Sequence, residues 1–119
     1  MYIVMFVLDD PDRLYDVLAA WRKAGIGGAT IMESTGIHRL QRCARVHARF
    51  DFAHLAEGCE LGHYTLFAIV KDEATVQACL RACESIVGDL DEPDTGVLAA
   101  WPLSLVKGVP ESAATAGRG

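Results

Sequence analysis

The chain has 119 residues, of which 51% are hydrophobic and 23% are charged, and its formal net charge is -5. This balance excludes a wholly disordered chain and allows one domain with a real core. The acidic excess argues against a general nucleic-acid binder, which would carry a broad basic face. We expect a cytoplasmic protein with free thiols, because the sequence shows neither an apolar run long enough to span a membrane nor a secretory signal.

The first part of the chain predicts a strand, a helix and a second strand. The run YIVMFVL, residues 2–8, is apolar and rich in β-branched residues, and it predicts a strand buried on both faces. Asp10 is a suitable N-cap, and Pro11 suits the first helical position. Apolar residues then recur at helical spacing until Gly25, and residues 29–35 form the next predicted strand.

The same pattern returns in the second half. The run YTLFAIV, residues 64–70, resembles the first strand, and an acidic break again follows it. A second helix is predicted before Gly88, and its apolar face is made of Val76, Leu80, Cys83 and Val87. Cys79 lies on this helix too, and both of its cysteines are expected in the core. A turn-rich connection leads to the last strand, residues 97–103.

The order β-α-β, long loop, β-α-β predicts an α+β fold of the ferredoxin-like type for residues 1–109. Such a domain has a four-stranded antiparallel sheet with both helices on one face, and we expect strands 2–8 and 64–70 at its centre. Both central strands are apolar on both faces, although the helices cover only one. We therefore expect another copy of the chain to cover the other face. Residues 110–119 have little to bury and are expected to form a flexible tail.

Two stretches carry a family resemblance. GIGGATIMESTGIHR, residues 25–39, and DTGVLAAWPLSLVKG, residues 94–108, are similar to the second strand with its loop entry and to the final strand of PII-like signalling proteins, the nitrogen regulatory PII superfamily. The resemblance implies a homotrimer that binds an adenine-nucleotide-type ligand in clefts between subunits. It also implies that the loop over residues 36–63, the T-loop equivalent, regulates a partner protein, often a membrane transporter or an enzyme.

The resemblance also implies which residues touch the ligand. One subunit would supply residues around the end of the second strand: Thr30, Thr35, Gly36, Ile37, His38 and Arg39. The neighbouring subunit would supply residues before the last strand: Asp94, Thr95 and Gly96. The chemistry agrees, because a Thr-Gly strand end can present backbone N–H groups and a hydroxyl to an anion. The alternative is an ordinary strand end at which glycine only permits the turn.

Four arginines follow that strand end, at positions 39, 42, 45 and 49. Their spacing places them on one stripe of a short helix predicted within residues 39–50. Arginine offers planar, permanently charged donors, so this stripe suits a phosphate or an acidic partner. A solvated helix face explains the pattern as well. Arg39 is the first choice for a phosphate contact because it is nearest to the strand end.

Two further functions remain open as alternatives. The pairs Cys43-x3-His47 and Cys59-x3-His63 could together close a tetrahedral zinc site, as in a metal-binding trimer of the CutA type. Their spacing differs from common zinc motifs, so no metal is expected. We also expect no enzyme activity, because the sequence shows none of the common catalytic motifs. A small ferredoxin-like oligomeric enzyme is the remaining alternative.

Overall fold

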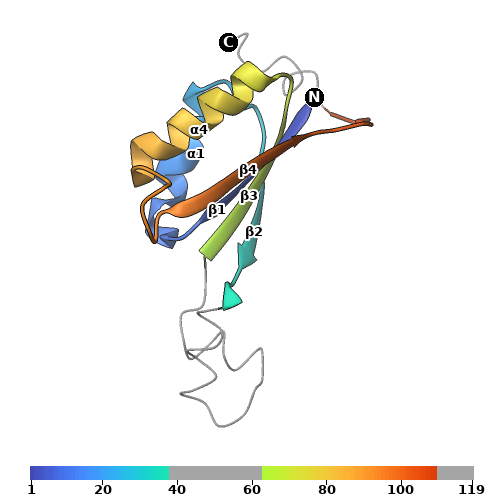
Figure 1. Cartoon of the computed structure of the whole chain (residues 1–119). Helices are drawn as coiled ribbons and strands as arrows, with labels where there is room; N and C mark the ends of the chain where they lie inside the picture. Colours follow the sequence, from blue (N-terminus) through green and yellow to red (C-terminus); the bar gives the residue numbers. More distant parts are fainter. Residues whose placement is uncertain (38–62, 110–119) are drawn as a thin grey trace, which may run out of the picture.

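The computed structural model describes residues 1–37 and 63–109, and these form an α+β structure (Figure 1). Its elements in chain order are β1 (Tyr2–Leu8), the 3-10 turn η1 (Pro11–Arg13), α1 (Leu14–Lys23), β2 (Thr30–Ser34), β3 (His63–Val70), α4 (Glu73–Val87) and β4 (Gly96–Pro102). The strands and helices predicted within these ranges are therefore confirmed, and the strand ends differ from the prediction by one residue.

The strands form one antiparallel sheet in the order β2-β3-β1-β4. β1 and β3 are the central pair, as their apolar runs predicted. Met5 in the middle of β1 lies opposite Phe67 of β3 and Ala99 of β4. β2 and β4 form the edges, and Pro102 ends β4, where its missing N–H breaks no ladder between central strands.

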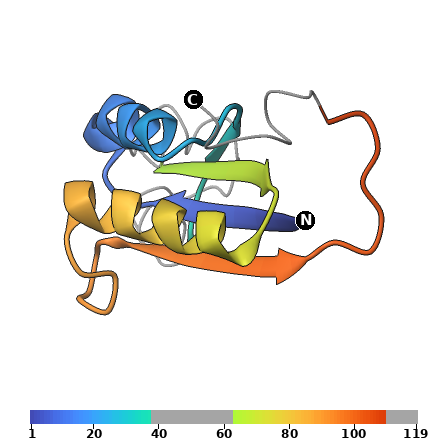
Figure 2. The ribbon, with the colours of Figure 1, turned by 90° about the horizontal axis from the view of Figure 1, so that it is seen from above.

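The core lies between the sheet and the two helices. α1 and α4 pack against each other and lie on the same side of the sheet (Figures 1 and 2). Because side chains alternate between the faces of a strand, every second residue of the central strands points into this core. The sheet contributes Val4, Phe6, Leu8, Leu66, Ala68 and Val70. The helices contribute Val17, Trp21, Val76, Cys79 and Cys83.

Among the described residues, no helix covers the opposite face of the sheet, which we call the open face. By the strand registers it is made of Ile3, Met5, Val7, Thr30, Met32, Ser34, His63, Thr65, Phe67, Ile69, Val97, Ala99 and Trp101. This set contains no Asp, Glu, Lys or Arg. Met32, Val97 and Trp101 are 53%, 59% and 44% exposed. On the central strands, the open-face residues such as Met5 and Phe67 are only partly buried, whereas those that face the core, such as Phe6, are fully buried. The two-sided burial predicted for these strands is therefore only partly achieved within one chain.

Both helical segments begin at an aspartate. Asp10 accepts a hydrogen bond from the Asp12 N–H at 3.0 Å, and Pro11 follows it, as predicted. This segment starts as a 3-10 turn and becomes α-helical only at α1. Asp72 caps α4, because it accepts hydrogen bonds from Thr75 N at 2.8 Å and from Thr75 Oγ1 at 2.7 Å. Such caps satisfy N–H groups that a helix start leaves without partners.

Some expectations fall on residues outside the described ranges. These are the helix within residues 39–50, its arginine stripe, and the tail over residues 110–119. The described residues hold the two ends of the predicted loop, at Ile37 and His63. In this part of the chain, no helix combines the length and apolar character needed to cross a membrane.

We predict that Asp72→Ala lowers the melting temperature at neutral pH, because α4 loses both capping hydrogen bonds. The hydrogen bond from the Thr75 side chain, with that from its backbone, lowers the pKa of Asp72 below its ordinary value of 3.8. A carboxyl group with a depressed folded pKa stabilises the fold above its unfolded pKa, and this contribution is lost as the pH falls through the folded value. The gap between wild type and variant should therefore shrink below about pH 3.8 in thermal scans followed by circular dichroism.

Asp12→Ala is the matched control. Asp12 is an exposed aspartate at the other helical start. Its backbone N–H donates the capping hydrogen bond to Asp10, so the side chain that caps this turn belongs to Asp10 and not to Asp12. The melting temperature of the Asp12→Ala variant should stay close to that of the wild type. A gap for Asp72→Ala that stays constant from neutral to acidic pH would contradict the capping role of the Asp72 carboxylate.

Candidate functional site

A hollow of about 390 Å³ lies on the open face, at the end of the sheet where β1 begins. Ile3, Phe67 and Ile69 contribute sheet residues to its lining, Thr30 lies at the entry to β2, and Lys107 comes from the segment after β4. Figure 2 shows that this segment leaves the end of β4 and turns back toward the β2 side of the sheet. We call this hollow the cleft.

The cleft combines apolar walls with few polar groups. Ile3, Phe67 and Ile69 offer apolar surface, and Lys107 is the only charged residue among the described residues of the lining. Gly28 leaves the backbone uncovered, since nothing lies within 4 Å of the place that a Cβ would take there. Pockets of this kind, mainly apolar with a few placed polar groups, suit small ligands. The lining fits a molecule with an apolar or planar part and an anionic group.

Thr35 and Ile37 lie at the far end of β2 from the cleft. Thr35 Oγ1 is buried and has no hydrogen-bond partner among the described residues. A buried hydroxyl left in this state costs about 1–3 kcal/mol. Ile37 is 66% exposed. A molecule bound at this corner could therefore accept or donate a hydrogen bond at the Thr35 hydroxyl and bury the exposed Ile37 side chain. His38 and Arg39, which come next in the predicted ligand set, lie outside the described residues.

Gly36 and Gly96 belong to the same predicted ligand set, but the structure gives only one of them a packing reason to be glycine. A Cβ at Gly36 would meet only His63 Nε2, at 3.5 Å, which is an ordinary contact. At Gly96 φ is +146°, and a Cβ would lie 2.6 Å from Val7 O and 3.0 Å from the Phe6 ring. The close approach of β4 to β1 therefore requires glycine at position 96. Nothing in the described residues requires it at position 36.

A polar network joins β2 and β3 where they meet the predicted loop. Ser34 Oγ lies 2.7 Å from His63 Nδ1 and 2.8 Å from Thr65 Oγ1. His63, the one described member of the alternative metal set, is only 8% exposed. The other members of that set lie in the undescribed range: Cys43, His47 and Cys59. Across residues 1–37 and 63–109, no group of three or more His, Cys, Asp or Glu side chains is placed to hold a metal ion.

Asp94, Thr95 and Gly96 lie at the start of β4, on the opposite edge of the sheet from β2. Asp94 has a φ of +63°, in the left-handed region that aspartate enters more readily than most residues. The Thr95 hydroxyl donates a hydrogen bond to Glu92 O at 2.9 Å. The local turn therefore already uses the hydroxyl that the resemblance assigns to the ligand.

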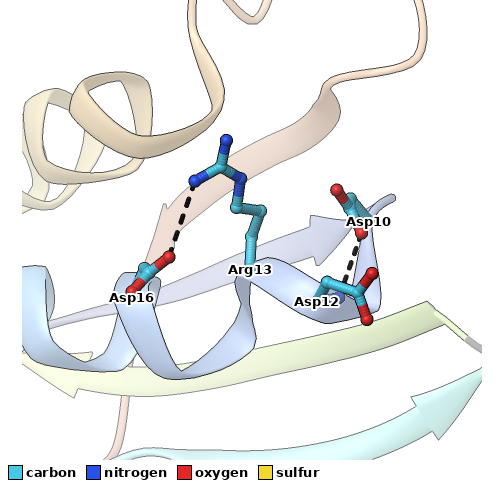
Figure 3. A network of polar contacts seen from close by, with 4 residues as sticks. All are labelled: Asp10, Asp12, Arg13 and Asp16. Carbon is cyan, nitrogen blue, oxygen red and sulfur yellow. Dashed lines mark hydrogen bonds and ion pairs between the residues drawn. The ribbon is translucent and has the colours of Figure 1, made fainter.

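A second, smaller hollow of about 180 Å³ lies beside this turn, and Asp94 and Thr95 line it together with Asp10 and Arg13. Figure 3 shows the polar contacts of the helical start next to it. Arg13 forms an exposed ion pair with Asp16 at 3.6 Å, and Asp10 caps the 3-10 turn. With two carboxylates and one paired arginine, this hollow does not by itself offer a phosphate site.

The three parts of the predicted ligand set are not brought together within one chain. β3 and β1 separate residues 35–37 from residues 94–96, which puts the two groups about 14 Å apart at ordinary strand spacing. Thr30, in the cleft, is five residues from Thr35, or about 17 Å along an extended strand. One adenine nucleotide does not reach all three groups in a single chain.

Sequence reasoning missed most of the cleft. The apolar pattern assigns Phe67 and Ile69 to a strand, but it does not show that they line a hollow. Lys107 lies in the Val-Lys-Gly stretch that carries part of the resemblance. The sequence signal that points to Lys107 is its position as a single cation after β4, whose open-face residues carry no charge.

No protein-family model matches the chain, and the comparison with curated proteins finds no significant relative. The family resemblance therefore rests on the two quoted stretches. The candidate site rests on the cleft, the corner at Thr35 and the open face between them.

We predict that Gly96→Ala lowers the free energy of unfolding by about 3 kcal/mol, because the new Cβ would collide with Val7 O at a strained φ. Gly28→Ala is the matched control, since its Cβ would meet nothing within 4 Å. It should change the free energy of unfolding by less than about 1 kcal/mol. Urea unfolding measures both variants, and equal effects would contradict the close approach of β4 to β1.

Proposed function

We propose that the chain is a PII-like signalling protein with a ferredoxin-like fold. It forms a homotrimer, binds an adenine-nucleotide-type ligand in clefts between subunits, and regulates a partner protein through residues 36–63. The observation that carries this proposal is the open face, which is mainly apolar and contains no Asp, Glu, Lys or Arg. The cleft lies at one end of this face, and the Thr35 corner follows β2 beyond the other end.

The strand order supports the ferredoxin-like assignment. Counted from the β4 edge, the order is β4-β1-β3-β2, and all neighbours are antiparallel. Two successive β-α-β units produce this order when their first strands form the central pair. α1 and α4 lie on one side of the sheet, as this plan requires (Figure 1). The open face is then the side that faces the inside of the proposed trimer.

The chemistry of the open face supports self-association. Met32, Val97 and Trp101 keep about half of their surface exposed, and each 100 Å² of apolar surface removed from water contributes about 2.5 kcal/mol. No charged side chain on the face has to be desolvated when two such faces meet. The polar Ser34 and His63 side chains are already hydrogen-bonded to each other. A second copy of the chain matches this surface in its apolar character and its lack of charge.

The two ends of the face supply different parts of a nucleotide site. The cleft has apolar walls for a base and Lys107 for an anion. The corner has Thr35 Oγ1, which has no hydrogen-bond partner among the described residues, and Gly36, which lets a ligand approach the backbone. By the resemblance, residues 94–96 of the neighbouring subunit would approach the corner. We propose in addition that the cleft of one chain meets the corner of the next in the ring of subunits, so that one ligand contacts both. Arg39 would follow the corner directly in the sequence.

The regulatory role of residues 36–63 is inferred from the resemblance. The structure supports it in one respect, because β2 ends at Ser34, two residues before Gly36, and β3 begins at His63. Ser34 and His63 are joined by a hydrogen bond at this end of the sheet. A ligand at Thr35 would therefore contact the start of the regulating segment.

Isothermal titration with ATP, ADP, AMP, cyclic AMP and cyclic di-AMP tests the proposed ligand class. We predict that at least one of these binds, and that Lys107→Gln weakens this binding roughly tenfold or more, because a hydrogen bond to a charged group contributes about 1.5–3 kcal/mol. Thr30→Val keeps the shape of the side chain and should weaken binding less.

Arg81→Gln is the control, because Arg81 is an exposed cation of α4, on the helix side of the sheet. The Arg81→Gln variant should bind the nucleotide with the same affinity as the wild type. If the folded wild-type chain binds none of these nucleotides, the ligand class is wrong. If Lys107→Gln and Arg81→Gln weaken binding equally, the cleft is not the site.

A further inference from the structure

A pair of thiols lies in the core between the two helices, apart from the cleft. Cys79 and Cys83 of α4 are free cysteines with no exposed surface, and Trp21 of α1 is 1% exposed. The Trp21 indole N–H donates a hydrogen bond to Cys83 Sγ at 3.1 Å. The thiol pair is therefore in direct polar contact with the neighbouring helix.

The two thiols are not equivalent. Cys83 Sγ accepts the hydrogen bond from Trp21. The neighbouring Cys79 side chain and this bond lower the pKa of Cys83, although burial acts in the opposite direction. The interaction with Cys83, together with burial, raises the pKa of Cys79. Cys83 is therefore the thiol that gives a thiolate more readily. Most buried cysteines only pack, whereas donors aimed at one sulfur favour thiolate chemistry.

The spacing of the pair determines what oxidation can form. Cys79 and Cys83 are four residues apart on α4, so their Cα atoms lie about 6 Å apart, within the range of a disulfide. Their Cβ atoms lie about 5–6 Å apart in a regular helix, but a disulfide needs about 3.5–4.5 Å. The sulfurs can therefore join only if this turn of α4 tightens. A disulfide strained in this way is easily reduced.

We propose that Cys79 and Cys83 form a redox-sensitive site, at which hydrogen peroxide reversibly converts the thiol pair to a strained disulfide and so changes the packing of α4 against α1. Trp21 couples the two helices. When Cys83 Sγ is drawn toward Cys79, the buried indole N–H loses its acceptor, which is unfavourable unless Trp21 also moves. Oxidation at α4 is therefore transmitted to α1.

The reaction balances with one peroxide as the two-electron oxidant. Cys83 first releases its thiol proton. The thiolate then attacks a peroxide oxygen, the O–O bond breaks, and the hydroxide that leaves takes up the released proton to form water. The product is the sulfenic acid of Cys83. The Cys79 sulfur then attacks the Cys83 sulfur. The S–S bond forms, the S–O bond breaks, and the leaving hydroxide takes up the Cys79 proton. Two thiols and one peroxide give one disulfide and two waters.

Access to the pair requires a local opening, because both thiols are buried. Cys83 lies one turn before the end of α4 at Val87, and Gly88 follows with a φ of +89°. Helix ends open at lower free energy than the core of a fold. A small oxidant is therefore expected to reach Cys83 more readily than a bulky one.

Peptide mapping tests the disulfide directly. In a full-length chain with Cys43→Ser and Cys59→Ser, only the α4 thiols remain. The native protein is treated with hydrogen peroxide, blocked with iodoacetamide and digested with trypsin without reductant. Because trypsin cuts after Arg81, between the two cysteines, a disulfide appears as peptide 72–81 cross-linked to peptide 82–107. We expect this product, and its loss on addition of dithiothreitol.

Tryptophan emission tests the coupling to α1. Adding Trp101→Phe to the same chain leaves Trp21 as the only tryptophan. We expect peroxide to change the Trp21 emission in parallel with the cross-link, and dithiothreitol to restore it. Cys83→Ser is the matched control, and peroxide should leave its emission unchanged.

Dimedone trapping tests the assignment of the attacking thiol. With Cys79→Ser, dimedone should label the sulfenic acid of Cys83. With Cys83→Ser, labelling of Cys79 should be at least about fivefold lower, because Trp21 donates its hydrogen bond to the Cys83 sulfur. Equal labelling would overturn the roles given to the two thiols.

Two results would overturn the redox site itself. One is a native chain that stays unlinked at a peroxide concentration that links the same cysteines in urea. The other is a cross-link that leaves the Trp21 emission unchanged, because it would remove the coupling to α1. The mapping experiment keeps both α4 thiols and Trp21, so it decides the question even if the serine variants at positions 79 and 83 fail to fold.

Discussion

β1 and β3 lie side by side at the centre of the sheet, and each carries apolar side chains on both faces. On one face these side chains meet α1 and α4 in a core that includes Trp21. On the other face the alternating residues form a surface without a charged side chain. The same alternation thus builds the core and creates the open face. The helices cover one face of the central strands, and the apolar side chains of the other face remain partly exposed in a single chain.

The proposed assembly and the proposed ligand site both follow from the open face, whose apolar side chains no element of the described chain covers. Within one chain, the cleft with Lys107 and the corner with Thr35 lie at opposite ends of β2, so neither is a complete nucleotide site. A subunit that covers the open face brings a second copy of each. The thiol pair at Cys79 and Cys83 belongs to the other side of the sheet, in the core beneath the helices. Its redox chemistry is therefore independent of whether the ligand proposal holds.

The sequence predicted the parts of this structure that depend on local pattern. The apolar runs located β1 and β3, and the Asp10–Pro11 pair located a helical start, but not its 3-10 form, because capping residues do not specify hydrogen-bond spacing. Contacts between distant segments were not predictable. Gly96 is glycine because β4 approaches β1 closely, and the Ser34–His63 bond depends on strand register. Lys107 reaches the cleft along a path with no periodic pattern.

Copies of this chain are proposed to cover the open face. Sedimentation equilibrium of the unmodified, folded chain over a range of micromolar concentrations measures whether they do. We expect a species with three times the mass of one chain, which persists on dilution. A folded monomer across the whole range would contradict this proposal, because the open face would then be stable in water without a covering subunit.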